Sequence, residues 1–333
     1  MRAKNDSAIY RPDLGITVME YVEGPTMAFI GLEVMPLYPT AKQAATYPVI
    51  PKEALLSVPD TARSPRGNYN RGDWEYERGQ FATSEHGWEE PIDDTERGLI
   101  EQEGSEGVGD FIATERAWKH IVRSQEKRVA DKVFNASNFT AHEVAEEWDD
   151  ASAATPINDV NDGKATFRTQ CGMLPDALII AWTTYQNLKE CDQIVNRLKY
   201  TFPGIDINKM TSAQLAAVFD VPRVLIGGSI YNASGKGIDA SITDIWSNEY
   251  AALVKISSGM DITEPGLGRT FLWTEDSPTN PIVEQYRENE IRSDIFRVRH
   301  HTDEAFMQSK NDSGTVVSDI AAACMYLFSN ITT

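Results

Sequence analysis

The residues best suited to phosphate chemistry are Gly235 and Lys236, in the glycine-rich stretch 233–237. A phosphate-binding loop needs a closer preceding glycine and a Ser or Thr directly after the lysine. Here six residues separate Gly228 from Gly235, and Gly237 follows Lys236. Both parts of the motif are therefore missing, and we predict an ordinary flexible loop.

Histidines and carboxylates near the end of the chain could hold a metal ion. His300 and His301 stand side by side, followed closely by Asp303 and Glu304. Neighbouring residues of a β-strand face opposite ways, so the two histidines would not converge on one ion. The pattern favours a strand with a hydrogen-bonded histidine.

Two pairs of adjacent aspartates could bind Mg²⁺ in the manner of a nuclease. They are Asp93–Asp94 and Asp149–Asp150. An acidic helix start and a solvated turn explain them more simply, because carboxylates are favourable at the positive end of a helix.

Side chains that could act as nucleophiles lack the partners that such chemistry requires. Cys171, Cys191 and Cys324 carry no local signature of a catalytic cysteine, and His86 has no triad context. Three cysteines without a CxxC pair do not indicate a disulfide framework, which favours a reducing compartment. We predict that the protein is not an enzyme and has no catalytic residues, cofactor or metal.

Composition limits the remaining functions. The chain has 333 residues, 41% of them hydrophobic, a formal charge of −19 and a pI near 4.7. This size allows two lobes, and the acidity disfavours binding to nucleic acid through phosphate neutralisation. The polar N-terminus and the lack of a long apolar run predict a soluble protein made in the cytoplasm, with no membrane contact.

One long helix is expected to position the rest of the chain, from Asp93 to Asn135. Its apolar residues recur at steps of seven and four and would share one face: Phe111, Trp118, Val122, Val129 and Val133. Three glycines interrupt the pattern between 104 and 109, so we expect a break or kink there.

The segment before the helix is expected to be extended. Residues 1–44 are rich in proline and would form an arm. Two short strand candidates, 47–50 and 73–77, flank a polar loop that is too long for a tight turn and should project. A two-stranded ribbon of this kind is marginal alone and needs a surface to lie on, and nothing nearby in the sequence offers one.

Charge suggests a partner for the projecting loop. Its tip is basic, with Arg63, Arg66 and Arg71. A run of acidic residues, which includes Glu89, Glu90, Asp93 and Asp94, follows about twenty residues later. In an assembly, the tip of one copy could contact the acidic run of the next, a head-to-tail contact that closes into rings. Two solvated faces of opposite sign would explain the same charges. The residues predicted to lie between subunits are Arg63, Arg66, Arg71, Trp74, Glu89, Glu90, Asp93 and Asp94.

The second half of the chain alternates helices and strands. We expect a helix over 141–150, a turn-rich linker at the lobe boundary over 155–163, and then an α/β lobe. Expected strands are 177–182, 224–226, 251–256, 270–274 and 295–301, and expected helices are 183–188, 192–200 and 213–219. The apolar stretch 316–328 closes the chain as a helix or a strand.

This order of parts resembles the major capsid protein of tailed bacteriophages, a fold also seen in encapsulin shells and the floor of herpesvirus capsids. The likeness covers most of the chain. It is strongest in framework motifs: Arg11-Pro12-Asp13-Leu14-Gly15, Arg71-Gly72-Asp73-Trp74, Gly87-Trp88-Glu89-Glu90-Pro91-Ile92-Asp93-Asp94, Pro175-Asp176-Ala177-Leu178, Tyr185-Gln186-Asn187-Leu188, Arg223-Val224-Leu225-Ile226-Gly227 and Trp246.

The resemblance implies an α+β fold with five regions. They are an N-terminal arm (1–44), an extended loop (45–85), a peripheral domain with a spine helix (86–160), an axial domain (161–284), and strands that return to the peripheral domain with a C-terminal element (285–333).

The resemblance also implies a function: self-assembly as pentamers and hexamers into an icosahedral head around double-stranded DNA. Expected partners are scaffolding, portal and decoration proteins, and the expected location is the virion after synthesis in the host cytoplasm. The alternatives are an encapsulin-like compartment and a metal-dependent hydrolase that uses the acidic clusters.

Overall fold

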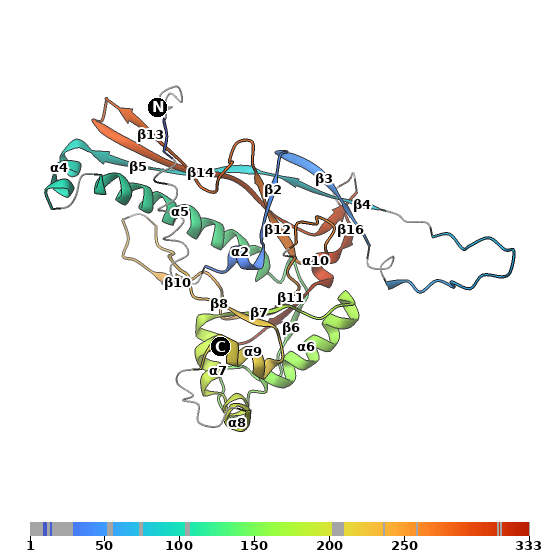
Figure 1. The fold of residues 1–333 in the computed structure, drawn as a ribbon. Coiled ribbons are helices and arrows are strands. Elements are labelled where there is room, and N and C mark those ends of the chain that lie inside the picture. The colour runs from blue at the N-terminus through green and yellow to red at the C-terminus, as the bar shows by residue number, and fades with distance from the viewer. Residues whose placement is uncertain are drawn as a thin grey trace.

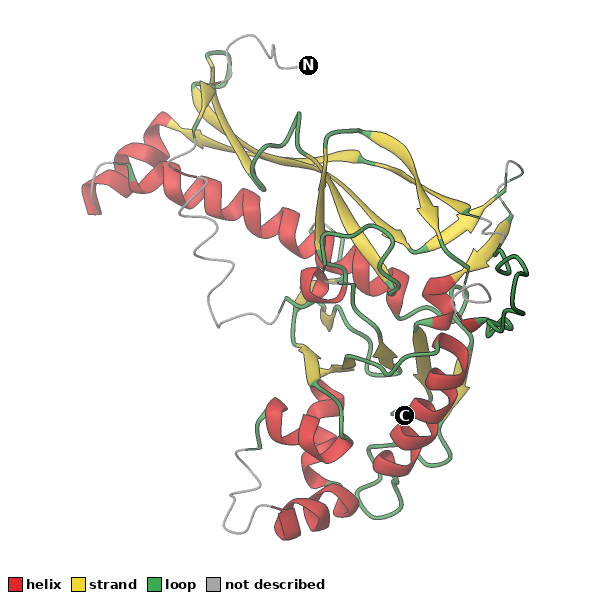
Figure 2. Ribbon diagram, turned by 45° about the vertical axis from the view of Figure 1, so that its right-hand side comes forward, coloured by secondary structure: helices red, strands yellow, loops and turns green. Residues whose placement is uncertain are grey.

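The computed structural model describes residues 9–11, 14, 29–51, 56–72, 76–103, 107–201, 210–235, 237–257, 259–311, 313 and 315–332. Figure 1 shows a long twisted sheet lying on one long helix, with a second, smaller sheet and its helices on the other side of that helix's end. Figure 2 shows the same layers from a second direction. Within the described residues, no helix is both long and apolar enough to cross a membrane.

The larger sheet is built around one long strand, β14 (Ser293–Phe306). The first half of β14 pairs with β13 on one edge and β5 on the other, and its second half pairs with β12. The sheet order is β1-β13-β14-β12-β2, with β5 also on β14. The other strands are β1 (Ile9–Tyr10), β2 (Leu37–Thr40), β5 (Ser84–Asp93), β12 (Gly268–Trp273) and β13 (Ile282–Glu288).

The predicted long helix is two helices, α4 (Asp94–Glu103) and α5 (Val108–Val133). The break falls where the glycines predicted it, and Gly107 adopts a left-handed conformation with φ 89°. The predicted start was wrong by one residue, because Asp93 is the last residue of β5 and pairs with Ser293.

Helix α5 contacts both sheets. Trp118 and Val122 pack with Phe296 and Val298 of β14. One turn and more further on, Val129 and Val133 pack instead against the smaller sheet. The predicted apolar stripe is confirmed except at Phe111, which is half-buried.

The expected hairpin is present as β3 (Ala44–Val49) and β4 (Glu77–Ala82), paired antiparallel. As expected, the ribbon lies on a surface, and nothing nearby in the sequence provides it: Tyr47, Val49 and Phe81 are buried in the core. The ring of Phe81 stacks on Phe271 of β12 with centroids 4.1 Å apart. The supporting surface comes from residues almost two hundred positions later, beyond the reach of local sequence reasoning.

The smaller sheet has the order β6-β17-β11-β7-β8. All five residues of β7 (Ala177–Ala181) are buried, because helices cover one face of this sheet and the end of α5 covers the other. The other strands are β6 (Ala141–Glu143), β8 (Arg223–Gly227), β11 (Ala251–Val254) and β17 (Met325–Ser329). The helices are α6 (Pro156–Cys171), α7 (Trp182–Glu190), α8 (Asp192–Thr201) and α9 (Ser212–Phe219).

Two predictions for this region were wrong. Residues 141–150 form no helix, because β6 pairs with β17 and turns follow it. The expected linker 155–163 is the first part of α6, in which Pro156 occupies the helix start that proline tolerates. Its apparent turn residue Gly163 is buried against Phe328, where an added Cβ would meet the ring at 2.7 Å. That glycine permits close packing rather than a turn.

The remaining elements complete the chain. The undecided stretch near the C-terminus contains β16 (Val316–Asp319), α10 (Ile320–Ala323) and β17. Thr211 caps α9 with a full capping box that it forms with Gln214. Four short elements complete the described residues: α2 (Gly31–Val34), β9 (Ile230–Asn232), β10 (Ile242–Asp244) and β15 (Gln308–Lys310).

Candidate assembly interface

The loop between β3 and β4 leaves the body of the subunit (Figure 1). None of its described residues, 56–72, is buried. Val58 is 96% exposed and Tyr69 is 72% exposed. Large apolar side chains gathered on an exposed projection indicate a surface that another molecule covers.

Contacts within the loop give it a defined shape. The Arg63 Nε donates to the Gly67 carbonyl oxygen at 2.7 Å, and its guanidinium lies 4.4 Å from the Tyr69 ring centroid. The Asn70 side chain donates to the Asp60 carbonyl oxygen at 2.8 Å and joins the two arms of the loop. The loop therefore holds its own form without contact to the sheet.

The predicted basic residues of the tip are exposed. Arg63 donates a hydrogen bond to the Tyr69 hydroxyl, whereas Arg66 and Arg71 make no ion pair with any described residue. Arg66 has φ 65°, a conformation that brings the chain round at the tip. Trp74, the aromatic residue predicted beside them, lies outside the described residues.

The acidic residues of β5 already have partners in their own subunit. Glu89 accepts a hydrogen bond from the Arg297 Nε at 2.7 Å. Glu90 accepts one from the indole nitrogen of Trp88 at 3.0 Å and lies 3.8 Å from Arg116 of α5. The acidic run is therefore partly neutralised before any neighbour arrives.

The start of α4 is arranged in the same way. Asp94 accepts two hydrogen bonds from Arg287, at 2.6 and 2.8 Å, which lower the pKa of this carboxyl. Asp93 accepts a hydrogen bond from the backbone N–H of Thr95 at 2.8 Å, which lowers its pKa too. Both residues act as the expected acidic helix start.

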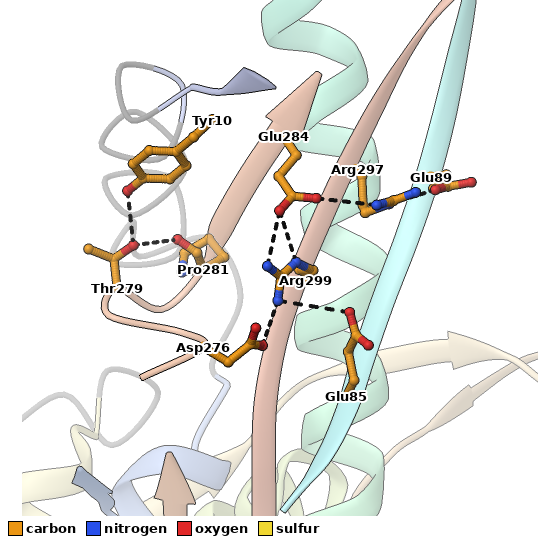
Figure 3. A network of polar contacts seen from close by, with 9 residues as sticks. All are labelled: Tyr10, Glu85, Glu89, Asp276, Thr279, Pro281, Glu284, Arg297 and Arg299. Atoms are coloured by element: carbon orange, nitrogen blue, oxygen red, sulfur yellow. Dashed lines mark hydrogen bonds and ion pairs between the residues drawn. The ribbon is translucent and has the colours of Figure 1, made fainter. Parts of the chain in front are cut away.

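A ladder of charges covers the outer face of the β5–β14–β13 sheet (Figure 3). Glu284 of β13 lies between two arginines of β14, 3.3 Å from Arg297 and 3.0 Å from Arg299. Arg299 also reaches Asp276 at 2.6 Å. Both arginine side chains are less than one fifth exposed, so this face is an ordered surface rather than a set of loose charges.

The sequence did not assign Arg297 and Arg299 to the candidate interface. Arg297 and Arg299 alternate along β14, a pattern that does indicate a shared outer face. Their acidic partners lie more than two hundred residues earlier or on a different strand, so the sequence does not pair them. The basic tip and the acidic run, in contrast, lie at opposite ends of one subunit (Figure 1).

The histidines predicted to diverge do so. His300 and His301 are both buried, on opposite faces of β14. His300 Nδ1 lies 3.1 Å from the Asn280 side-chain oxygen, and His301 Nδ1 lies 3.0 Å from the Thr83 hydroxyl. Burial, together with the nearby positive Arg128, lowers the pKa of His300 to about 3, so its ring is neutral.

The other candidates for chemistry have structural roles where they are described. Asp150 caps a turn by accepting hydrogen bonds from the backbone of Ser152 and Ala153. Lys236 lies outside the described residues. Across the described part of the chain, no three His, Cys, Asp or Glu side chains gather closely enough to share a metal ion.

The fold itself is known from other proteins. The chain aligns with a phage-related protein from Bordetella bronchiseptica with a TM-score of 0.69 and 19% identity, over 98% of this chain and 99% of that one. It also aligns with the virus-like particle of Pyrococcus furiosus with a TM-score of 0.52 and 9% identity, over 95% and 96% of the two chains. The α+β class is confirmed, and the fold is that of these phage-related and virus-like-particle proteins.

A comparison of sequences gives a more specific relationship than the shared fold. The chain is 29% identical over 280 residues to the major capsid protein of Burkholderia phage BcepMu, which covers 81% of this chain and 86% of the relative. No family model matches the sequence. The relative and the shared fold together confirm the resemblance to phage major capsid proteins.

Proposed function

We propose that this chain is a structural major capsid protein that assembles with copies of itself into an icosahedral phage head. The relative that is a phage major capsid protein supports this function, and so does the shared fold. The observation that carries it is the loop 56–72, whose tip is ordered by its own contacts and leaves the apolar side chains of Val58 and Tyr69 largely exposed.

In this proposal the loop lies on a neighbouring subunit, and the charged face of its sheet receives the basic tip. Glu85 and Glu89 keep 57% and 43% of their side chains exposed although each has an arginine nearby, so both retain oxygens for a second cation. Arg66 and Arg71 would supply that cation. Each such exposed pair contributes at most about 1 kcal/mol, so the apolar residues of the loop must supply much of the contact.

The regions of the subunit then take distinct roles. The long sheet with α5 would be the peripheral domain, and the smaller sheet with α6–α9 would be the axial domain, which meets its copies in pentamers and hexamers. The role is structural rather than catalytic, and the location is the virion after synthesis in the host cytoplasm. Scaffolding, portal and decoration proteins would be its other partners.

Packaged double-stranded DNA would be enclosed without sequence-specific binding. The net charge of −19 supports this, because a strongly acidic container does not adhere to a polyanion.

The proposal is tested by assembly of the purified full chain, measured by light scattering and negative-stain microscopy. We expect closed shells or rings. A variant whose residues 57–72 are replaced by a short Gly-Ser turn should keep the β3–β4 ribbon and the circular dichroism of the parent, but should not form shells. A chain that stays monomeric at every concentration, with or without an added scaffolding protein, would overturn the proposal.

An encapsulin-like compartment is the second candidate, favoured by the fold shared with the Pyrococcus furiosus virus-like particle. Particle contents separate the two. A phage head produced with its packaging proteins contains DNA, whereas a compartment of this type contains protein cargo. Hydrolysis of DNA by the purified chain that required Mg²⁺ and stopped with a chelator would instead support the hydrolase alternative.

A further inference from the structure

We infer that Cys171 and Cys324 are the site of an intrachain disulfide that fastens the C-terminal segment of the subunit to helix α6. Cys171 is the last residue of α6, and Cys324 lies between α10 and β17. Although 153 positions separate them in sequence, their sulfur atoms lie 2.7 Å apart. The third cysteine, Cys191, lies apart from them at the junction of α7 and α8 and directs its sulfur toward the Ala154 carbonyl oxygen, 3.7 Å away.

The surroundings hold the two thiols facing each other. Cys171 is 7% exposed and Cys324 is 1% exposed. The backbone N–H of Lys255 donates to the Cys324 carbonyl oxygen at 3.0 Å, and the backbone N–H of Cys324 donates to the Ile320 carbonyl oxygen at 2.8 Å. At their present separation the sulfurs are inside ordinary van der Waals contact, so only a small side-chain movement would bring them to the bond length of about 2.03–2.05 Å.

The two thiols are also chemically unequal. A hydrogen bond with Cys324 lowers the pKa of the Cys171 thiol, and Lys255 acts in the same direction. The same pairing and burial raise the pKa of the Cys324 thiol. Cys171 is therefore the thiolate that reacts first, because the thiolate is the nucleophile in thiol–disulfide exchange.

The oxidant is a low-molecular-weight disulfide such as glutathione disulfide. The Cys171 thiolate attacks one of its sulfurs, and one glutathione leaves as a thiolate. Cys324 loses its proton and attacks the Cys171 sulfur of the mixed disulfide, which releases the second glutathione. Two cysteine thiols are oxidised, one glutathione disulfide is reduced, and the two protons end on the two glutathione molecules. In a reducing cytoplasm the pair stays as thiols, so the bond forms after the protein leaves it.

The bond would act on β17, which lies between β11 and β6 in the smaller sheet and begins one residue after Cys324. Closing so long a loop restricts the unfolded chain strongly. The oxidised subunit should therefore unfold at a temperature several degrees higher than the reduced one.

The test uses the purified full chain, incubated either with glutathione disulfide or with a phosphine reductant, then unfolded and alkylated. Intact mass spectrometry should count one alkylated thiol after oxidation and three after reduction, and digestion should release a linked peptide pair containing Cys171 and Cys324. The Cys191→Ser variant should give none after oxidation and two after reduction. Cys324→Ser should trap the mixed disulfide: one alkylated thiol and one glutathione adduct on Cys171 after oxidation, and two alkylated thiols after reduction. This variant should also lose the shift in unfolding temperature.

Three free thiols after prolonged oxidation would overturn the inference, and so would a disulfide that includes Cys191. Stable glutathione adducts on Cys171 or Cys324 of the parent chain would overturn it as well. If Cys324→Ser does not fold, Cys171→Ser replaces it and should give two alkylated thiols in both samples, because the attacking thiolate is absent. Oxidation of the chain unfolded in guanidinium is a further control, because the Cys171–Cys324 link should then lose its preference over links to Cys191. None of these measurements depends on shell assembly.

Discussion

Helix α5 and the loop 56–72 differ in how much of each is buried within the subunit. Twelve of the 26 residues of α5 are buried, and they contact two different sheets. No described residue of the loop is buried; the contacts that order its tip are internal, and Leu56 at its base lies against Gly172 just after α6. The free energy of folding is therefore concentrated in α5, and the loop contributes little to it.

The comparison teaches that stability and assembly can be changed separately in this subunit. Substitutions in α5 should act on the unfolding of the single subunit. Substitutions in the loop should leave unfolding almost unchanged and act on the contact proposed with a neighbour.

The largest effect is expected for Trp118→Ala. Trp118 is 5% exposed and packs between Phe296 and Val298 of β14. Removing it leaves a large cavity, which should lower the free energy of unfolding by about 3–5 kcal/mol. Chemical denaturation of the unassembled subunit measures this loss, and an unchanged midpoint would show that α5 does not carry the stability assigned to it.

Glu126→Ala should have the next largest effect. The Glu126 carboxylate accepts hydrogen bonds from the backbone N–H groups of Ile30 and Gly31, at 2.9 and 2.7 Å, and from the Trp246 indole at 2.6 Å. Without it three buried donors lack an acceptor, which should cost roughly 2–4 kcal/mol. Lys127→Ala on the outer side of the same helix is the matched control and should cost about 1 kcal/mol, for its pair with Asp131 and its contact with the Tyr231 ring. Equal losses in both variants would contradict the comparison.

Acid should weaken the contact between α5 and β14. Burial lowers the pKa of His300 to about 3 and also lowers the pKa of His86, whose ring lies 5.8 Å away. Below pH 6.5 His300 binds a proton in the unfolded chain but not in the folded chain. Its contribution to stability is therefore full above pH 6.5 and is lost progressively as the pH falls toward 3. The slope for His300 approaches about 1.4 kcal/mol per pH unit. Denaturation between pH 7 and 5 should show a shallower slope for His300→Phe than for the parent chain; identical slopes in the two would refute it.

The smallest effect on folding is expected for reversal of charge in the loop, Arg63→Glu, Arg66→Glu and Arg71→Glu together. All three side chains are exposed, so the free energy of unfolding should change by less than about 0.5 kcal/mol. Shell formation, followed by light scattering, should be impaired.

A matched triple reversal of the exposed Lys42, Arg78 and Lys310, outside the loop and outside the proposed axial domain, changes the net charge equally. It should assemble better than the loop variant. Full assembly of the loop variant would remove the basic tip from the proposed contact.

The sequence predicted the periodic parts of this fold well. The stripe of α5, the short helix α9 and the buried strand β7 are local patterns, and the structure confirms each of them apart from Phe111 in the stripe. Helix α6 was missed because the Asn, Asp and Gly residues of its first half suggest turns, and only its contact with Phe328 explains Gly163. Local sequence patterns cannot predict the contact between Gly163 and Phe328, because the two residues are far apart in the sequence.

The candidate interface could be predicted only in part. The exposed basic tip follows from composition and loop length. The arginines of β13 and β14 that occupy the acidic run depend on strand register, which joins residues such as Arg297 and Glu89 across the chain. Which carboxylates stay available for a neighbour is therefore a property of the folded sheet.

The pairing of β14 also has a mechanical consequence for a shell under internal pressure. Along its 14 residues, β14 is hydrogen-bonded to β13, β5 and β12. A pull along this strand loads all of those bonds at once, in shear, and the sheet resists it as a unit. A pull on the tip of the loop, in contrast, acts on both strands of the β3–β4 ribbon together and loads the side-chain packing that holds the ribbon to the core, such as Phe81 on Phe271. The long sheet should therefore resist tension along β14 stiffly, whereas the loop and its ribbon should deform under a smaller force.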